Sequence, residues 1–308
     1  MPENIHVDAI PKISIVMGVF RGLESLSVTV ESILQQTFTD FEIVIVDDGN
    51  CPADSALICE TAKRDARIRV LRLDVNSGLT KALAKGCAES KGLYIARIDN
   101  GDLMVPATRL KHQYDTLETS KASLVSGGMM VVDLLNKDTY QSRKREAPWT
   151  RFGPNDPELK KIAHVTVMFR SEDYRAVGGY NEKSLTGQDS ELWPRILTRG
   201  AGLLTGNIYA IAPMRVESIS VAGNNKQIVG EIKREVSNLR TKKFRLRSVL
   251  SITLHLLKIL IPLPIRVKLR YRKNYDYIGK YSSDDVSLAA IWTWYRESEA
   301  EQQVGDVI

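Results

Sequence analysis

The chain has 308 residues, of which 43% are hydrophobic, as in a soluble globular protein with room for one large domain and an appendage. Its three cysteines are odd in number and stand in no metal-ligand spacing, which argues against a disulfide framework and favours a reducing, cytosolic compartment. The first twelve residues hold two acids and no long apolar run, so they do not resemble a secretory signal.

The formal net charge of +6 is distributed unevenly. Between Lys226 and Lys273 there are 14 basic residues and 2 acids, a net of +12, which leaves the rest of the chain at −6. A mildly acidic body with a strongly basic segment indicates that the segment has its own partner, namely anionic lipid, nucleic acid or an acidic ligand.

Apolar runs of strand length alternate with helical periods over the first hundred residues. Strands are expected at 13–19, 41–46, 68–73 and 93–98, and helices at 23–36, 53–64 and 80–88. This alternation predicts an α/β domain with a mainly parallel, doubly wound sheet. No Gly-x-Gly-x-x-Gly follows the first strand and the sequence has no Gly-Lys-Ser/Thr, so neither a dinucleotide site nor a P-loop is predicted.

Polar or glycine-rich residues follow three of these strands, at 20–22, 47–50 and 99–102. Parallel strand ends meet at one edge of the sheet, where α/β sheets bind ligands, so a nucleotide-binding crevice is predicted there. Asp99 and Asp102 offer oxygen ligands that suit a hard divalent cation holding a diphosphate. The alternative is an ordinary Asn-Gly turn with solvated acids.

The second half of the chain reads less regularly. The pattern predicts a helix at 107–118, an apolar stretch at 124–135 broken by Gly127 and Gly128, a polar loop at 136–156 and a strand at 162–170. A further helix opens at 187, with Asp189 in its first turn. Acids favour that position through the helix dipole, so Asp189 could simply cap the helix.

The basic segment contains an expected helix at 246–261, which has a narrow polar stripe and a broad apolar surface. Pro262 and Pro264 end it, and clustered Lys and Arg follow. It is too short to span a membrane, and the pattern is typical of a helix that lies in an anionic membrane surface. The alternative is a helix packed on the preceding domain with a solvated basic rim. A last helix is expected at 284–298.

Five motifs in order resemble the inverting family 2 glycosyltransferases of the GT-A fold, especially the bacterial enzymes of surface polysaccharide synthesis. They are Ile13 to Met17, Ser32 to Gly49, Tyr94 to Asp102, His164 to Arg170 with Gly178 to Tyr180, and Gln188 to Trp193. The resemblance runs from about residue 13 to about residue 200. It implies a GT-A (nucleotide-diphospho-sugar transferase) catalytic domain at 13–220. The expected organisation adds an N-terminal extension at 1–12 before this domain and, after it, the basic, amphipathic helical region at 221–308, which its charge and apolar pattern predict to associate with membranes.

The resemblance also implies a role for individual residues. Asp48 would accept the uracil imide hydrogen of a UDP sugar, with the backbone around Val19 and Phe20 beside the base. Asp99 and Asp102 would lie by the diphosphate and its Mn²⁺ or Mg²⁺, and Asp189 would be the general base.

Three basic side chains complete the implied site. Lys81 and Arg97 would be diphosphate partners, although basic residues in such places are often simply solvated. His164 lies in a motif that usually lines the acceptor side, although a lone histidine at a strand start is often structural.

Three positions depart from the family pattern. Gly101 stands where the metal motif commonly has an aspartate, Gly18 replaces a proline, and Ala84 stands where asparagine is usual. With Gly101 in place, three readings stay open: Asp102 takes over the metal, Asp99 holds a ribose hydroxyl, or the metal binds weakly.

The interpretation is a metal-dependent inverting glycosyltransferase at the inner face of a bacterial cell membrane. It would move a sugar from a UDP sugar to a hydroxyl of a lipid-linked glycan during O-antigen, capsule or lipopolysaccharide synthesis. One alternative is a catalytically weakened GT-A domain that serves as a binding or scaffold subunit, which Gly101 suggests and an intact Asp189 argues against. A nucleic-acid partner is not expected, because few aromatic residues are interleaved with the basic ones.

Overall fold

The computed structural model describes residues 10–133, 137–142, 149–184, 187–214, 253 and 275–280. These residues fall into two compact units. The first contains the described residues up to Met130 and from Ser142 to Ala212. The second contains those between 131 and 141 and between 213 and 281.

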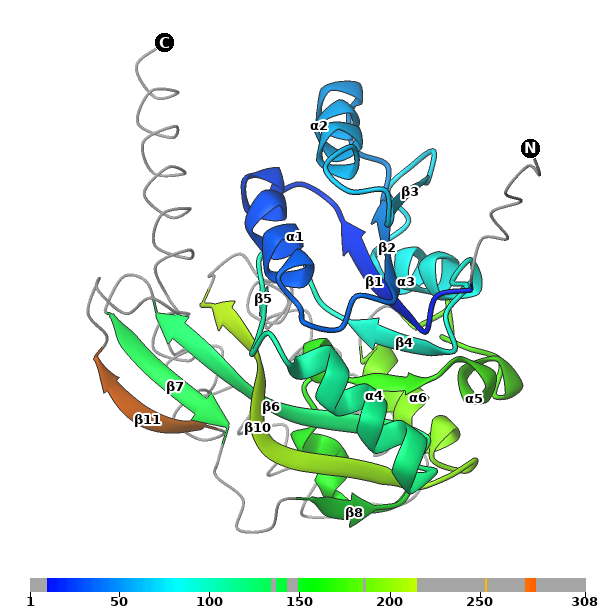
Figure 1. The fold of residues 1–308 in the computed structure, drawn as a ribbon, viewed down its shortest axis with the longest axis vertical. Coiled ribbons are helices and arrows are strands. Elements are labelled where there is room, and N and C mark those ends of the chain that lie inside the picture. The colour runs from blue at the N-terminus through cyan, green and yellow to red at the C-terminus, as the bar shows by residue number, and fades with distance from the viewer. Residues whose placement is uncertain are drawn as a thin grey trace, which may run out of the picture. The chain divides into compact units, whose positions relative to one another are not determined.

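A mixed sheet forms the centre of the first unit (Figure 1). Its strand β1 (Ile13–Val19) pairs in parallel with β2 (Phe41–Asp47) and β4 (Tyr94–Arg97), and β2 pairs in parallel with β3 (Ile68–Arg72). Beyond β4 the pairing is antiparallel, first with β9 (Met168–Arg170) and then with β6 (Leu124–Asp133). The expected parallel sheet is therefore confirmed for the first four of these strands, and the rest of the sheet is antiparallel.

Helices cover both faces of this sheet. One face carries α1 (Leu26–Leu34), α2 (Pro52–Ala62) and α4 (Arg109–Ser120), and the other carries α3 (Leu79–Ala88), α5 (Ser171–Ala176) and α6 (Gln188–Ile196). The side chains of β1 alternate, so this strand packs against the helices on both faces of the sheet. Ile15 and Met17 belong to one apolar cluster and Val16 to the other. Every residue of β1 except Gly18 is buried, as expected for a central parallel strand.

Two expectations for the middle of the chain were wrong. The segment 136–156, expected as a loop, contains β7 (Asp138–Ser142) and β8 (Thr150–Phe152). Gly127 lies within β6 and does not interrupt it. The ring of Tyr209 packs directly against Gly127, where a Cβ would lie 2.3 Å from Tyr209 Cδ2. Tyr209 belongs to β10 (Gly202–Pro213), which pairs with β6, with β8 and with β5 (Leu103–Met104).

The strand expected at 162–170 is mostly absent. The 3-10 helix η3 (His164–Thr166) lies within it, a second 3-10 helix, η2 (Pro157–Lys161), precedes it, and β9 begins only at Met168. Thr166 donates to the carbonyl of Ala163 from both its backbone N (3.0 Å) and its Oγ1 (2.8 Å). These local hydrogen bonds form a turn, and a turn at this point competes with the pairing of a strand.

The expected helices at 246–261 and 284–298 lie outside the described residues, apart from Thr253. In the second unit, β11 (Tyr275–Lys280) pairs with β7, and Tyr277 Oη donates to Asp138 Oδ1 at 3.2 Å. A strand thus lies in a region expected to be helical. Within the described part of the chain, no helix is long and apolar enough to cross a membrane.

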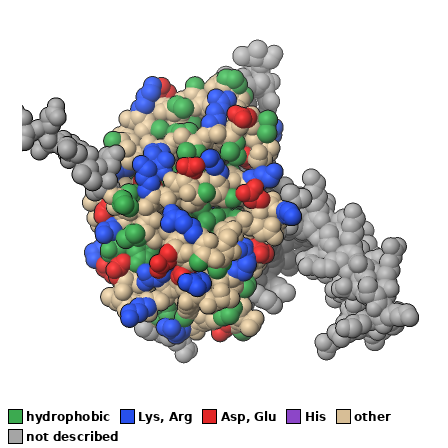
Figure 2. Space-filling view, turned by 90° about the vertical axis from the view of Figure 1, so that its right-hand side faces the viewer, with side chains coloured by type: hydrophobic (Ala, Val, Ile, Leu, Met, Phe, Trp, Pro, Cys, Tyr) green, Lys and Arg blue, Asp and Glu red, His purple; other side chains and the backbone are tan. Residues whose placement is uncertain are grey.

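Acidic and basic side chains are interspersed on the face of the molecule shown in Figure 2. Several form exposed ion pairs within one helix, such as Lys85 with Glu89 and Lys111 with Asp115. Pairs of this kind add little to stability.

One charged cluster is buried at the edge of the sheet where β1 begins. Glu42 accepts hydrogen bonds from Ser14 Oγ (2.6 Å), Lys91 N (2.7 Å) and Arg69 Nε (2.7 Å). Burial raises the pKa of Glu42, but the bonds from Arg69, Ser14 and Lys91 outweigh it and hold the pKa below 4.5. The ionised carboxylate therefore ties β1, β2, β3 and the turn before β4 together.

Replacing this carboxylate should destabilise the fold. Glu42→Gln should lower the free energy of unfolding by about 2 kcal/mol at pH 7, because charge-assisted bonds are lost in a buried site. Since the folded pKa is depressed, this contribution is present above pH 4.5 and is lost as pH falls through the folded pKa. Urea unfolding of wild type and variant from pH 7 to pH 3 should show the difference shrinking. Glu60→Gln, which breaks an exposed pair with Lys63, is the control; equal effects of the two substitutions would contradict the assignment.

Candidate active site

Three loops meet at the C-terminal edge of the parallel strands. They follow β1, β2 and β4, which are adjacent because β1 lies between the other two. The loops are residues 20–22, 48–51 and 98–102. The predicted meeting of these segments at one edge is therefore confirmed.

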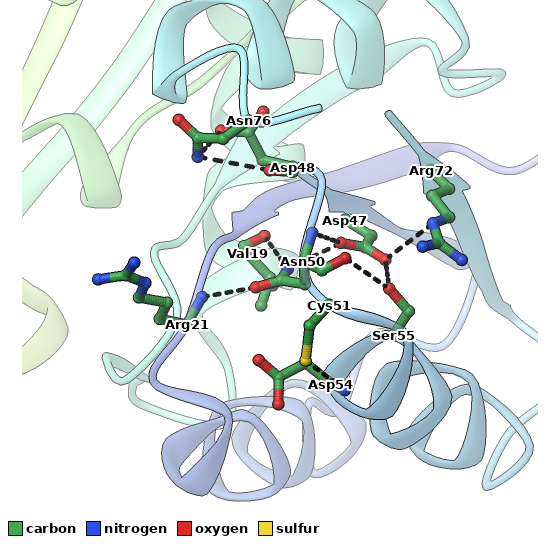
Figure 3. Close-up of polar contacts among 10 residues, drawn as sticks. All are labelled: Val19, Arg21, Asp47, Asp48, Asn50, Cys51, Asp54, Ser55, Arg72 and Asn76. Atoms are coloured by element: carbon green, nitrogen blue, oxygen red, sulfur yellow. Dashed lines mark hydrogen bonds and ion pairs between the residues drawn. The ribbon is translucent and has the colours of Figure 1, made fainter. Parts of the chain in front are cut away.

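Asp47 and Asn50 shape the loop after β2 (Figure 3). The buried Asp47 carboxylate accepts from Asn50 N (3.0 Å) and Nδ2 (2.7 Å) and from Ser55 Oγ (2.5 Å), and Arg72 Nε lies 3.8 Å away. Burial raises the pKa of Asp47, but the bonds from Ser55 and Asn50 and the charge of Arg72 outweigh it and lower the pKa. Asp47 is thus a structural anion that fixes the turn.

Asn50 joins this loop to the loop after β1. Its Nδ2 donates to the carbonyl of Val19 (2.9 Å), and its Oδ1 accepts from Arg21 N (2.8 Å). Arg21 has a positive φ of 58°, and the ring of Phe20 is 43% exposed under the Arg21 guanidinium. Asn50 therefore sets the position of the Val19–Phe20 segment. Its place three residues after a strand-ending aspartate is the one signal in the sequence that could have suggested this role.

Asp48 has a structural role that the sequence did not indicate. Its carboxylate accepts from Ser77 N (2.8 Å), Gly78 N (3.0 Å) and Asn76 Nδ2 (3.1 Å), so it holds the loop that leads into α3. The side chain is buried. Two carboxylate oxygens offer about four lone-pair sites, so one acceptor position remains for another donor.

Gly49 permits the close approach of these two loops. It has a φ of +71°, and a Cβ there would lie 2.2 Å from the backbone carbon of Val75. Any other residue would push the Val75–Gly78 loop away from Asp48.

Asp99 and Asp102 share one tight turn after β4. Asp102 N donates to Asp99 O at 3.1 Å, and Gly101 between them has a φ of +94°, which favours glycine. The turn is tied to α1 through Gly101 N and Thr29 Oγ1 (2.8 Å). Asp99 is 38% exposed.

The turn offers two carboxylates to a cation. In the described residues no group of three or more His, Cys, Asp or Glu could hold a metal ion. Two carboxylates fit Mg²⁺ or Mn²⁺ where the remaining ligands come from substrate phosphates and water, as is common for such ions.

Arg97 is not the diphosphate partner that was expected. Its side chain is completely buried. Nη1 donates to the carbonyls of Val16 and Ile98, Nη2 donates to Asp99 Oδ1 (2.7 Å), and Nε donates to His164 Nε2 (3.2 Å). The guanidinium thus acts on the site only through Asp99 and His164.

His164 is a neutral ring packed under the site. Its Nε2 also lies 2.8 Å from Tyr180 Oη. Burial and the Arg97 guanidinium lower the pKa of His164 well below its usual value. Because a guanidinium can only donate, Nε2 must be the acceptor, which places the ring proton on Nδ1.

Asp189 is the second residue of α6, and Gly187, with a φ of 69°, occupies the N-cap position. The alternative that Asp189 caps the helix is therefore wrong. Burial, above all, raises the pKa of Tyr180 well above its usual value, and the Asp189 carboxylate is close enough to add to that effect. Lys81 is exposed on α3.

Residues 14–177, more than half of the chain, match the family described as glycosyl transferase family 2. The chain belongs to this family. Among its relatives, the O-antigen biosynthesis glycosyltransferase WbnJ of Escherichia coli is 27% identical over 204 residues, which are 64% of this chain and 76% of WbnJ. Other relatives are named for the biosynthesis of succinoglycan and amylovoran.

Solved structures show the same fold at low identity. Residues 1–349 of TarS from S. aureus in complex with UDP-GlcNAc match with a TM-score of 0.58 and 15% identity, over 80% of this chain and 71% of that one. The mannosyltransferase PcManGT from Pyrobaculum calidifontis in complex with GDP-Man and Mn²⁺ matches with a TM-score of 0.54 and 13% identity, over 84% of this chain and 72% of that one. The expected α/β fold is therefore confirmed, with structural matches to GT-A transferases.

The structural role of Asp48 can be tested without any ligand. Asp48→Asn should lower the free energy of unfolding by about 2 kcal/mol, because an amide NH₂ would face backbone N–H donors in a buried site. Asp74→Asn, an exposed acid in the following loop, is the matched control and should leave stability unchanged. Urea unfolding measures both. Equal stability of the Asp48 variant and wild type would show that the loop does not depend on this carboxylate.

Proposed function

We propose that this family 2 member is an inverting glycosyltransferase that uses a UDP sugar and a divalent metal ion to glycosylate a hydroxyl of a lipid-linked glycan in bacterial surface polysaccharide synthesis. The observation that carries the proposal is the Asp99–Asp102 turn at the C-terminal edge of β4, next to the Asn50-clamped end of β1. An α/β sheet binds nucleotides at such an edge.

The donor would lie across the ends of β2, β1 and β4. Val19 and Phe20 offer backbone and an exposed ring to the base, and the remaining acceptor position of Asp48 suits the uracil imide N–H. Lys81, exposed on α3, is the proposed cationic partner of the diphosphate in place of the buried Arg97.

Asp99 and Asp102 would hold Mn²⁺ or Mg²⁺, which stabilises the charge of a departing diphosphate when bound. The structural neighbour PcManGT, crystallised with GDP-Man and Mn²⁺, supports this assignment, and TarS with UDP-GlcNAc supports a UDP sugar as donor. Asp189 would take the proton of the acceptor hydroxyl as a general base, so that the hydroxyl attacks the anomeric carbon in line and inverts it.

Association with the inner face of the cell membrane is part of the proposal. It is supported by the excess of basic residues between Lys226 and Lys273 and by the need to reach a lipid-linked acceptor.

The second candidate function is a scaffold subunit that keeps the fold and has lost transfer. Gly101 favours it, because the metal motif of the family commonly has an aspartate at this position. Such a subunit could bind UDP and would not turn over a UDP sugar.

Calorimetry and a transfer assay separate these possibilities. UDP titrated into the full chain should bind more tightly with Mn²⁺ or Mg²⁺ than with EDTA. Asp189→Asn should bind UDP as the wild type does, yet release of UDP from a panel of UDP sugars, with bacterial membrane lipid as acceptor, should fall by about a hundredfold or more because the base is lost. Asp74→Asn is the control.

Each other outcome has a clear meaning. Wild type that binds UDP without any turnover would favour the scaffold function. Normal turnover in the Asp189 variant would remove Asp189 as the base, and no UDP binding under any condition would overturn the donor assignment.

A further inference from the structure

A chain of hydrogen bonds runs beneath the site from Asp99 to Tyr180. Asp99 accepts from Arg97 Nη2 (2.7 Å), Arg97 Nε donates to His164 Nε2 (3.2 Å), and the same nitrogen lies 2.8 Å from Tyr180 Oη. With the proton of the neutral ring on Nδ1, Tyr180 must also donate to Nε2. Both donors therefore converge on a single acceptor atom.

Packing holds each member of this chain in one place. The His164 ring meets Tyr180 edge-on at 6.0 Å and Trp193 edge-on at 5.6 Å, and both of these aromatic side chains are buried. Arg97 N also donates to the Val167 carbonyl at 3.1 Å, which fixes β4 against the segment that follows η3. These ring contacts and hydrogen bonds hold the imidazole and the guanidinium in one arrangement.

The two ends of the chain belong to the two halves of the proposed site. Asp99 lies on the turn assigned to the diphosphate, and Tyr180 lies close enough to Asp189, the proposed base, to feel its charge. Arg97 is completely buried, and its side-chain hydrogen bonds all go to acceptors within the protein. Of these acceptors, Asp99 is the one that lies on the proposed donor site, so Arg97 would orient a ligand through Asp99.

We propose that His164 and Tyr180 are positioning residues, which hold the Arg97 guanidinium so that it presents the Asp99 carboxylate to the donor nucleotide in one fixed orientation. This inference rests on the proposed function of Asp99. It assigns His164 to the donor side of the site, whereas the resemblance implied the acceptor side. It also gives Tyr180 a role that the sequence analysis did not predict.

The physical reason is preorganisation. A partly exposed aspartate on a turn can rotate freely, and a ligand that needs one rotamer must supply the ordering free energy when it binds. A guanidinium that is itself locked removes this cost beforehand, and outer partners of this kind are commonly worth about ten- to a hundredfold in affinity or activity.

The decisive variants differ in a single acceptor atom. His164→Phe keeps an aromatic ring against Trp193 and leaves Arg97 Nε without an acceptor, whereas His164→Gln restores an oxygen at the place of Nε2. By calorimetry, UDP affinity with Mn²⁺ should fall about tenfold or more in His164→Phe and recover most of that loss in His164→Gln. Tyr180→Phe should show a smaller loss, because one of the two donors remains.

A second tyrosine–histidine pair supplies matched controls. Tyr209 Oη is hydrogen-bonded to His112 Nδ1 between β10 and α4, and this bond is not part of the chain from Asp99 to Tyr180. His112→Phe and Tyr209→Phe remove the same kinds of group and should leave UDP affinity unchanged. Equal losses in both pairs, or no recovery in His164→Gln, would overturn the positioning role and indicate a general loss of stability.

Nitrogen-15 NMR of labelled histidine tests the chain without any nucleotide. The protein has only four histidines, so the His164 signal can be assigned from its loss in His164→Gln. The Nδ1–H form with an accepting Nε2 is expected near neutral pH. A protonated Nε2 would overturn the inference even if UDP binds. If the wild type binds no UDP, the proposed donor site is wrong. The tautomer of His164 would then still show whether its Nε2 accepts the hydrogen bond from Arg97.

Discussion

The parallel pairing of β1 with β2 on one side and β4 on the other is the constraint on which the site depends. The register sets Val19 opposite Asp47 and Val16 opposite Arg97, so β1 and β2 end side by side and the segment that follows β4 continues to the same edge. Asn50 can then bond the carbonyl of Val19, and Arg97 can bond that of Val16. The loops that carry Asp48 and Asp99 thus flank the end of one strand because of backbone pairing alone.

The sequence predicted this half of the fold well because its signals are local. The buried strands β1 and β2 are each seven residues long and mostly apolar, and turn residues follow them directly. The antiparallel half could not be predicted in the same way. Its strands β5, β8 and β9 have two or three residues each, too few to show a period of two, and their pairing depends on partners distant in the chain.

The sheet edge at which the candidate site lies was predicted, and the contacts of its residues were predicted only in part. Motif spacing singled out Asp48, Asp99 and Asp189 as candidates, but a sequence does not tell which polar side chains are buried. Arginine is rarely fully buried without partners, so Arg97 was expected to contact a diphosphate or solvent. Its acceptors include the carbonyl of Val16 and the ring of His164, which are distant in sequence and could not be foreseen from the residues around Arg97.

Two buried cations stand behind the acidic turn. Arg109, like Arg97, is completely buried, and its Nη2 donates to the Arg97 carbonyl at 3.0 Å. Burial, above all, and the Arg97 guanidinium lower the pKa of Arg109 to about 9 against the attraction of Tyr209 and Asp102, so the guanidinium stays charged at neutral pH. Two fixed positive charges therefore oppose the two carboxylates of the turn. They offset part of the repulsion that Asp99 and Asp102 would exert on the diphosphate of the proposed donor. With Gly101 in place of a third acid, the turn comes close to charge balance, and a bound metal ion would add net attraction for the anion.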